Sequence, residues 1–386
     1  MAELDSLQDA IVVDDVIEGL RKWVEMETPS RDAEAVNGLM DIVAAEATAA
    51  GLTVERYPGR DGFGDALRLE TRPDENGPRL LVVTHMDTVH PHGTLEDLPF
   101  RREGDRLYGP GIYDMKGGAY LALEAVRALA KTGRASKLPL TILVMADEEA
   151  GSPVGRDLIE AEAARAAAAL VVEPAREGGR IVTARNGAAR YRLSAVGKPA
   201  HSGSRHQDGA SAIREIAAKT VGLEAMTDYG KGLTVNVGVV EAGTAVNVIP
   251  ARAEAEIDIR MPDLETADAI EARMAALTAE IPGVTLTVSG GLNRPPMERT
   301  PAVSALFELA QELAADIGFE LDTVPRTGGG SDGNFTAALG VPTLDGLGVD
   351  GAGAHTLEEH LLVSSIKPRC ALLAGLFETV GPEMLP

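Results

Sequence analysis

The most informative segment of this chain is the stretch Leu80-Leu81-Val82-Val83-Thr84-His85-Met86-Asp87. Its continuously apolar run is typical of a strand buried on both faces of a parallel sheet. In an extended segment, residues i and i+2 point to the same side, so His85 and Asp87 face the same way. One side chain could bind a metal while the other orients it. A lone His-x-Asp pair is common by chance, so its meaning depends on the rest of the chain.

Three further apolar runs also lead to acidic or imidazole residues. Residues 138–145 are followed by Asp147-Glu148-Glu149, and residues 168–172 are followed by Glu173. Residues 341–344 lead through a glycine-containing loop to His355. Ligands of open α/β sheets bind outside the carboxyl ends of the strands. We therefore expect these side chains to gather at one edge of a sheet.

Asp114 lies in a glycine-rich loop, residues 109–118, that precedes a stretch rich in Ala and Leu. The glycines predict a tight loop, and residues 119–129 predict a helix. A carboxylate is favoured near the start of a helix. Taken alone, Asp114 is therefore more typical of a helix cap than of a metal ligand.

The adjacent residues Glu148 and Glu149 suit a division of labour. Neighbours on an extended chain point in opposite directions. One glutamate could then bind a metal while the other serves as a general base toward a bound water. Because the chain contains 59 Asp and Glu residues, a solvated acidic turn is the competing interpretation.

Together these motifs resemble the M20 metallopeptidases, most closely the glutamate carboxypeptidase (carboxypeptidase G2-like) branch. The resemblance covers nearly the whole chain, and the motifs follow one another in the family's order. It is carried by His85-Met86-Asp87-Thr88, the loop around Asp114, Asp147-Glu148-Glu149, Glu173-Pro174 and His355-Thr356.

The resemblance implies two zinc ions per subunit, with Co²⁺ or Mn²⁺ as substitutes. The implied ligands are Asp114 as a bridge, His85 and Glu173 on one ion, and Glu149 and His355 on the other. Glu148 would be the general base, and Asp87 would orient the ring of His85. This assignment agrees with zinc chemistry, in which imidazoles and carboxylates are common ligands and an outer carboxylate sets the imidazole tautomer.

The resemblance also implies a second, smaller domain that forms a lid and a dimer interface. His201, in Gly197-Lys198-Pro199-Ala200-His201-Ser202-Gly203, would polarise the scissile carbonyl in the partner subunit of a homodimer. An exposed loop histidine is the alternative interpretation. The chain between Arg185 and Gly187 is expected to mark a hinge.

Several residues are candidates for holding the carboxylate of a substrate. Asn247 and Arg260 match family lid segments, and Arg294 is a further candidate beside Pro295. Arginine suits this work because its planar fork binds a carboxylate through two parallel hydrogen bonds. Gly329 and Ser331 lie in a loop whose amides could form an anion nest.

Composition narrows the class of protein. The 386 residues suffice for two domains, 45% of them are hydrophobic, and the formal net charge is −23. Such a negative charge argues against binding nucleic acid or an anionic membrane. The N-terminus lacks a signal-like pattern, and no apolar run reaches the ~18 residues of a membrane span. The single Cys370 is expected to be buried and excludes an internal disulfide, so we expect a cytoplasmic protein.

The pattern of apolar residues predicts an α/β protein with an inserted domain. Strands and helices alternate up to Glu173, which predicts a mixed, mostly parallel sheet with helices on both faces. Residues 188–293 contain period-two segments separated by helical stretches, typical of a smaller α+β lid. Residues 1–187 and 294–386 would then form the catalytic domain.

These inferences predict a dizinc hydrolase that cleaves an amide bond next to a free carboxylate. The expected activity is that of a carboxypeptidase releasing a C-terminal amino acid such as glutamate from a small peptide or N-acyl amino acid. The alternatives are an N-acyl-amino-acid deacylase (aminoacylase-like) and a dipeptidase. A binding or regulatory protein that has lost activity is disfavoured because every expected site residue is present.

Overall fold

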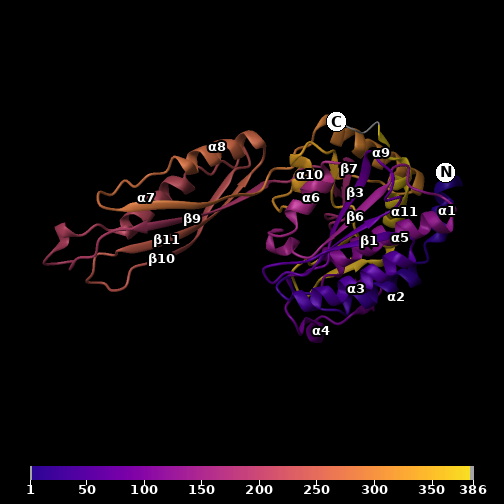
Figure 1. The fold of residues 1–386 in the computed structure, drawn as a ribbon, viewed down its shortest axis with the longest axis horizontal. Coiled ribbons are helices and arrows are strands. Elements are labelled where there is room, and N and C mark those ends of the chain that lie inside the picture. Colours follow the sequence, from indigo (N-terminus) through magenta and orange to yellow (C-terminus); the bar gives the residue numbers. More distant parts are fainter. Residues whose placement is uncertain (1, 383–386) are drawn as a thin grey trace. The chain divides into compact units, whose positions relative to one another are not determined.

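The structure, a computed structural model, describes residues 2–382, which form two compact units (Figure 1). The first unit comprises the chain up to Ala184, Arg299–Thr327 and the chain from Ser331 onward. The second comprises Arg185–Glu298 and Gly328–Gly330. Within the described residues, no helix is both long and apolar enough to cross a membrane.

A six-stranded mixed sheet organises the first unit. Its strand order is β1-β2-β6-β3-β7-β14. The strands are β1 (Thr53–Tyr57), β2 (Ala66–Glu70), β3 (Arg79–His85), β6 (Leu140–Met145), β7 (Ala166–Val171) and β14 (Thr343–Leu344). β6, β3, β7 and β14 run parallel, whereas at one edge β2 pairs antiparallel with β6 and β1 pairs antiparallel with β2. The expected mixed, mostly parallel sheet is confirmed.

Both faces of this sheet are buried, which explains why its central strands are continuously apolar. Leu80 and Val82 of β3 belong to one hydrophobic core, whereas Leu81 and Val83 belong to another. Helices on the first face are α2 (Val13–Val24), α3 (Ala33–Ala49), α5 (Gly117–Lys131), α9 (Pro301–Ile317) and α11 (Val363–Thr379). Helices α6 (Arg156–Ala163) and α10 (Gly333–Ala338) cover the other.

The start of α5 is held unusually close to the end of the central sheet. A Cβ on Gly118 would lie 1.9 Å from the carbonyl oxygen of Val172, so only glycine fits at that position. This close approach places the preceding turn, residues Ile112–Lys116, beside the carboxyl end of β7. The turn carries Asp114.

The second unit is an antiparallel sheet covered on one side by two helices (Figure 1). Its strand order is β10 (Thr234–Ala242), β11 (Arg252–Met261), β9 (Gly187–Val196) and β12 (Thr285–Arg294). Tyr191 and Leu193 face the core under α7 (Ala212–Glu224) and α8 (Leu264–Ala275), whereas Arg190 and Arg192 are exposed. The expected separate α+β unit is confirmed.

The second unit extends beyond the expected limits of 188 and 293. Arg185 and Met297 exchange two backbone hydrogen bonds, which prolongs the pairing of the chain entering and leaving this unit. The Arg185 guanidinium also donates to the carbonyl of Gly329, 3.0 Å away. This contact joins residues 328–330 to the second unit.

Candidate metal centre

Three neighbouring strands deliver the central side chains of the site. β3 ends at His85 and lies between β6 and β7. Glu148 and Glu149 follow β6, and Glu173 follows β7. Because these strands are parallel, their carboxyl ends share one edge of the sheet, as expected for an open α/β fold.

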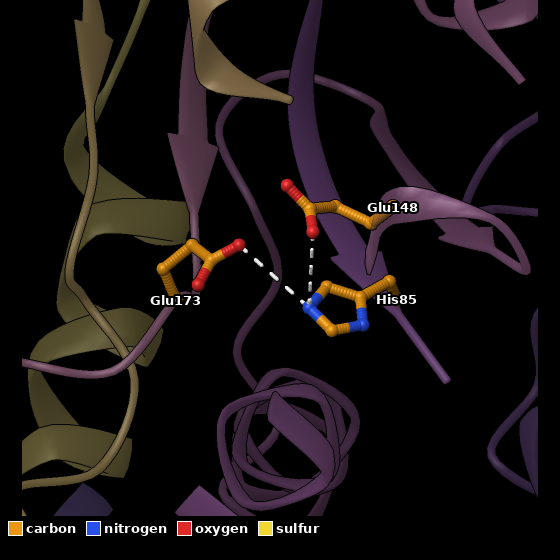
Figure 2. A group of neighbouring side chains, drawn as sticks. All are labelled: His85, Glu148 and Glu173. Atoms are coloured by element: carbon orange, nitrogen blue, oxygen red, sulfur yellow. Dashed lines mark ion pairs between the residues drawn. The ribbon is translucent and has the colours of Figure 1, made fainter. Parts of the chain in front are cut away.

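Carboxylates surround the ring of His85. Its Nε2 atom lies 3.5 Å from Asp114 Oδ1, 3.7 Å from Glu173 Oε1 and 4.0 Å from Glu148 Oε2. Figure 2 shows Glu148 and Glu173 pointing toward this nitrogen from two sides. Asp114 and Glu149 also place one ligand atom each within 4.8 Å of His85.

The two oxygens of Asp114 face different imidazoles. Oδ1 faces His85, and Oδ2 lies 3.2 Å from Nε2 of His355. The same His355 nitrogen lies 3.3 Å from Oε1 of Glu149. Asp114 therefore stands between two sets of potential ligands. It makes no helix cap, because it precedes α5 and its side chain is engaged by the histidines.

The spacing fits metal ions better than direct hydrogen bonds. Zinc bonds of about 2.0–2.1 Å in a tetrahedron place two ligand atoms about 3.3–3.4 Å apart. The contacts of 3.2–3.7 Å between Asp114, Glu149, Glu173 and the two imidazoles are close to this value and mostly exceed ordinary hydrogen-bond lengths. Among the described residues, His85 Nε2 and Glu149 Oε1 are buried atoms without a hydrogen-bond partner. The residues present therefore fit a metal centre.

The electrostatics of the cluster also favour cations. Burial, together with the nearby Asp114 carboxylate, raises the pKa of Glu173 well above its usual value, and burial raises that of Glu149. Burial opposes ionisation of Asp114, but the imidazoles of His355 and His85 outweigh it and lower its pKa. Asp114 and Glu149 in turn raise the pKa of His355 to about 10. The site thus gathers more carboxylates than its imidazoles can neutralise.

Contacts of Asp87 orient both His85 and the glutamate turn. His85 Nδ1 lies 3.0 Å from the carbonyl oxygen of Asp87 and 3.4 Å from its Oδ1. A carbonyl only accepts, so the ring carries its proton on Nδ1 and leaves the Nε2 lone pair for a metal. The Asp87 carboxylate accepts from the backbone N–H groups of Glu148 and Glu149 and from the Ser30 hydroxyl.

The two glutamates diverge for a reason other than the expected one. Glu148–Ala150 forms a single turn of 3₁₀ helix, so an extended chain is the wrong description of this segment. Successive side chains still point differently on this turn. Glu149 reaches His355, whereas Glu148 faces His85. Distance alone also allows Glu148 as a ligand, since it lies within 4.8 Å of His85 and Glu173 atoms.

A buried carboxylate that sequence reasoning missed holds the Asp114 turn in place. Glu359 is fully buried and accepts from the backbone N–H groups of Gly111, Tyr113 and Asp114 at 2.9–3.1 Å. His90 Nε2 lies 2.6 Å from its second oxygen. The sequence points to Glu359 through its position four residues after His355.

Two of the predicted lid residues, His201 and Asn247, lie in adjoining loops of the second unit. The backbone N–H of Ser202 donates to the carbonyl of Asn247, and His201 pairs with Val248. His201 Nδ1 accepts from the N–H groups of Gly203 and Ser204 at 3.1 and 3.3 Å. The neutral ring therefore carries its proton on Nε2, which makes that atom a hydrogen-bond donor.

Arg260 and Arg294 lie at the opposite end of the same sheet. Both pair with Ala188 at the start of β9, whereas Arg252, next to the Asn247 loop, pairs with Val196 at its end. At about 3.3 Å per residue, the eight residue steps from Arg252 to Arg260 separate the two ends by about 26 Å. Arg260 makes two hydrogen bonds to Asp258, and Arg294 is buried.

The remaining two candidates are held within the protein. The carbonyl of Gly329 accepts a hydrogen bond from Arg185. Ser331 is fully buried, its hydroxyl donates to Asp345, and its N–H donates to the Asn334 side chain. Ser331 therefore shapes the loop and offers no open hydroxyl to a substrate.

Comparisons with known proteins point to one family. Residues 81–379 match the model of peptidase family M20/M25/M40. The chain is 32% identical to carboxypeptidase G2 of Pseudomonas sp. (strain RS-16), over 95% of this chain and 89% of that protein. It is 29% identical to the succinyl-diaminopimelate desuccinylase of Gluconacetobacter diazotrophicus, over 88% of this chain and 91% of the relative.

A solved structure shares the fold. The aminopeptidase PepT of Bacillus cereus superposes with a TM-score of 0.76 and 23% sequence identity, over 95% of this chain and 98% of that one. At this level of identity, the likeness supports the architecture described above and does not specify a substrate.

We expect Asp114→Ala to lower the occupancy of both metal positions together, because its two oxygens face different imidazoles. His85→Ala and His355→Ala should each weaken mainly one position. Elemental analysis of metal-loaded, gel-filtered proteins would measure this. Equal metal content in Asp114→Ala and the parent would contradict the bridging geometry.

We expect Glu359→Gln to weaken metal binding and turnover by about tenfold, since an amide must turn its NH₂ group toward at least one buried N–H donor. Leaving such a donor unsatisfied costs about 1–3 kcal/mol. The matched control is Glu358→Gln, which alters an exposed neighbour. Metal titration and kcat would be measured for both variants. Parent-like values for Glu359→Gln would show that Glu359 is not needed to position the turn that carries Asp114.

Proposed function

The chain belongs to peptidase family M20/M25/M40, and on that premise we propose that it is a dizinc hydrolase cleaving an amide bond next to a free carboxylate. The observation that carries this proposal is the placement of the Asp114 oxygens against two imidazoles within a cluster of buried carboxylates. Release of a C-terminal amino acid such as glutamate is the favoured activity. The similarity to carboxypeptidase G2 supports it.

The proposed metal ligands follow from the geometry and from the donor chemistry. Asp114 would be shared, His85 and Glu173 would hold one zinc ion, and Glu149 and His355 would hold the other. When bound, such ions supply Lewis-acid polarisation of the amide carbonyl and lower the pKa of water. Co²⁺ or Mn²⁺ would substitute, since the same nitrogen and oxygen donors accept them.

Glu148 is proposed as the general base. Its carboxylate faces the cluster, and its Oε2 lies 4.0 Å from His85 Nε2, farther than the oxygens of Asp114 and Glu173. The backbone of Glu148 is anchored by Asp87 at 3.1 Å, so the side chain starts from a fixed point. It would take a proton from the attacking water and pass it to the departing amide nitrogen.

The substrate carboxylate is proposed to bind cationic and amide groups from the second units of two subunits, since Asn247 lies at the opposite end of the sheet from Arg260 and Arg294. Arg260 and Arg294 supply guanidinium groups, and Asn247 supplies an amide on an exposed turn. Arg260 is already paired with Asp258 through two hydrogen bonds, so a substrate carboxylate would share or replace that partner. Gly329 and Ser331 would shape the loop that contains them, residues 328–331.

We propose that His201 acts in the partner subunit of a homodimer. Its Nε2–H is available as a donor toward a developing oxyanion, because Nδ1 is occupied by two backbone N–H groups. His201 and Arg260 lie at opposite ends of one sheet, so one chain cannot bring both to one substrate. β10 is an edge strand with exposed Val239 and Val240, which suits pairing with a second copy.

Two alternatives share this chemistry. An N-acyl-amino-acid deacylase or a dipeptidase would use the same centre with a different acyl group, and the desuccinylase relative keeps the first of these open. The proposed partners are a small peptide or N-acyl amino acid and a second copy of the chain. A net charge of −23 disfavours nucleic acids and anionic membranes. A cytoplasmic location stays a prediction.

The test of function combines a substrate panel with the Glu148 variant. Metal-loaded protein should release free amino acid from some members of a panel of N-acyl amino acids and dipeptides, scored by ninhydrin. Glu148→Gln should abolish turnover while keeping both metals, because only the base is lost. Near-normal kcat in this variant would contradict the assignment of Glu148 as the general base. Loss of metal would show that Glu148 is a metal ligand.

We expect subunit exchange between two inactive variants, His201→Ala and Glu148→Gln, to restore activity. One site of a mixed dimer would combine Glu148 of the first chain with His201 of the second. An oxyanion donor is worth ~10²–10³ in kcat, so the restored signal should exceed either parent variant clearly. Fluorescently labelled chains would establish exchange. Exchange without activity would show that His201 does not act in trans.

A further inference from the structure

A cavity of about 410 Å³ lies next to the metal centre within the first unit. His355 lines it and also contacts Asp114 and Glu149, so the cavity and the centre share one side chain. The other walls come from residues 89–94, from Asp97 and from Thr356 and Leu357. Its volume lies within the usual range of small-molecule sites, about 300–1,000 Å³.

The cavity offers apolar surface to a ligand. Val89 and Leu357 are exposed hydrophobic side chains in its lining, with relative exposures of 43% and 52%. Exposed side chains of this size are unremarkable singly, but here two of them border the same cavity beside a candidate catalytic centre. An apolar group placed there would remove both from water.

The polar side chains of the cavity already have partners. His90 is bonded to the buried carboxylate of Glu359 at 2.6 Å. His92 Nε2 lies 2.8 Å from Asp32, and its Nδ1 lies 3.7 Å from Glu27. Each imidazole that lines the cavity therefore faces at least one carboxylate, and Asp97 adds a further negative charge.

The backbone N–H groups at the start of the short helix α4 (Thr94–Asp97) also have a partner. The backbone N–H groups of Gly93 and Leu95 both donate to the carboxylate of Glu27 at 2.8 Å. No Lys or Arg is found among the residues that line the cavity. A second carboxylate placed here would meet acidic neighbours and no uncommitted cation.

We propose that this cavity receives the acyl group of the substrate and selects an uncharged, apolar acyl group against an anionic one. The inference rests on the proposed amide hydrolysis next to a free carboxylate. That free carboxylate needs cationic partners, which the cavity lacks, so the cavity suits the opposite side of the scissile bond. Val89 and Leu357 are the residues that would contact the acyl group.

The proposal separates this chain from a desuccinylase, whose acyl group carries a carboxylate. A matched pair of substrates tests it: the N-(4-methylpentanoyl) and N-succinyl derivatives of the amino acid that the metal-loaded enzyme releases fastest. The two acyl groups have nearly the same shape and differ in charge. We expect kcat/KM to favour the uncharged substrate by at least ~10-fold, since this cavity offers an anion acidic neighbours and no uncommitted cation.

Charge-altering variants test whether the substrate preference arises at Val89 and Leu357 in this cavity. Leu357→Arg and Val89→Arg introduce a cation at exposed positions, where folding should be unaffected. Each should reduce the preference for the uncharged substrate by at least ~10-fold. The matched control is Leu339→Arg, which alters an exposed leucine of the same unit outside the cavity and should keep the parent ratio.

The outcomes distinguish this proposal from the proposed function. Turnover of both substrates at equal kcat/KM, or a parent ratio retained in both arginine variants, overturns the acyl site alone. A preference for the succinyl substrate also overturns it. Failure of the metal-loaded protein to hydrolyse any N-acyl amino acid or dipeptide overturns the proposed function, and the acyl site with it.

Discussion

The carboxylate of Asp114 is the point on which the rest of the site depends. It is largely buried, yet the imidazoles of His85 and His355 lower its pKa and hold one oxygen each. Such a buried carboxylate stays ionised only where the backbone holds it beside its two imidazole partners, since desolvation by itself favours the neutral form. The close approach of Gly118 to Val172 and the hydrogen bonds of Glu359 provide that fixation.

The first unit therefore treats its acidic side chains in two ways. The carboxylate oxygens of Asp87 and Glu359 bind backbone N–H groups and neighbouring hydroxyl or imidazole groups. These two residues therefore fix the positions of the segments around the site. Glu149 and Glu173 keep oxygens directed at the imidazoles, at distances that suit ions. Fully paired carboxylates give a rigid frame, and incompletely paired ones leave room for cations. This division separates supporting groups from candidate ligands within one acidic cluster.

The strand register of the second unit determines at which end of its sheet each candidate substrate-binding residue lies. A four-stranded antiparallel sheet places Asn247 and His201 at one end and Arg260 and Arg294 at the other. A dimer would bring the two ends of different chains to one substrate, which is the physical basis for a shared site. Such sharing would make assembly a condition for activity and would tie substrate recognition to an interface.

What the sequence determined by itself was local and periodic. Apolar runs predicted the parallel strands, and family motifs predicted His85 and its acidic neighbours, because each of these signals is contained within a few consecutive residues. The tertiary structure alone decided the contacts between distant segments: Glu359 reaches the N–H of Asp114 across 245 residues, and Glu27 fills the amides that follow His92. An isolated glutamate has no periodicity or motif, so its role emerges only when packing buries it against particular donors.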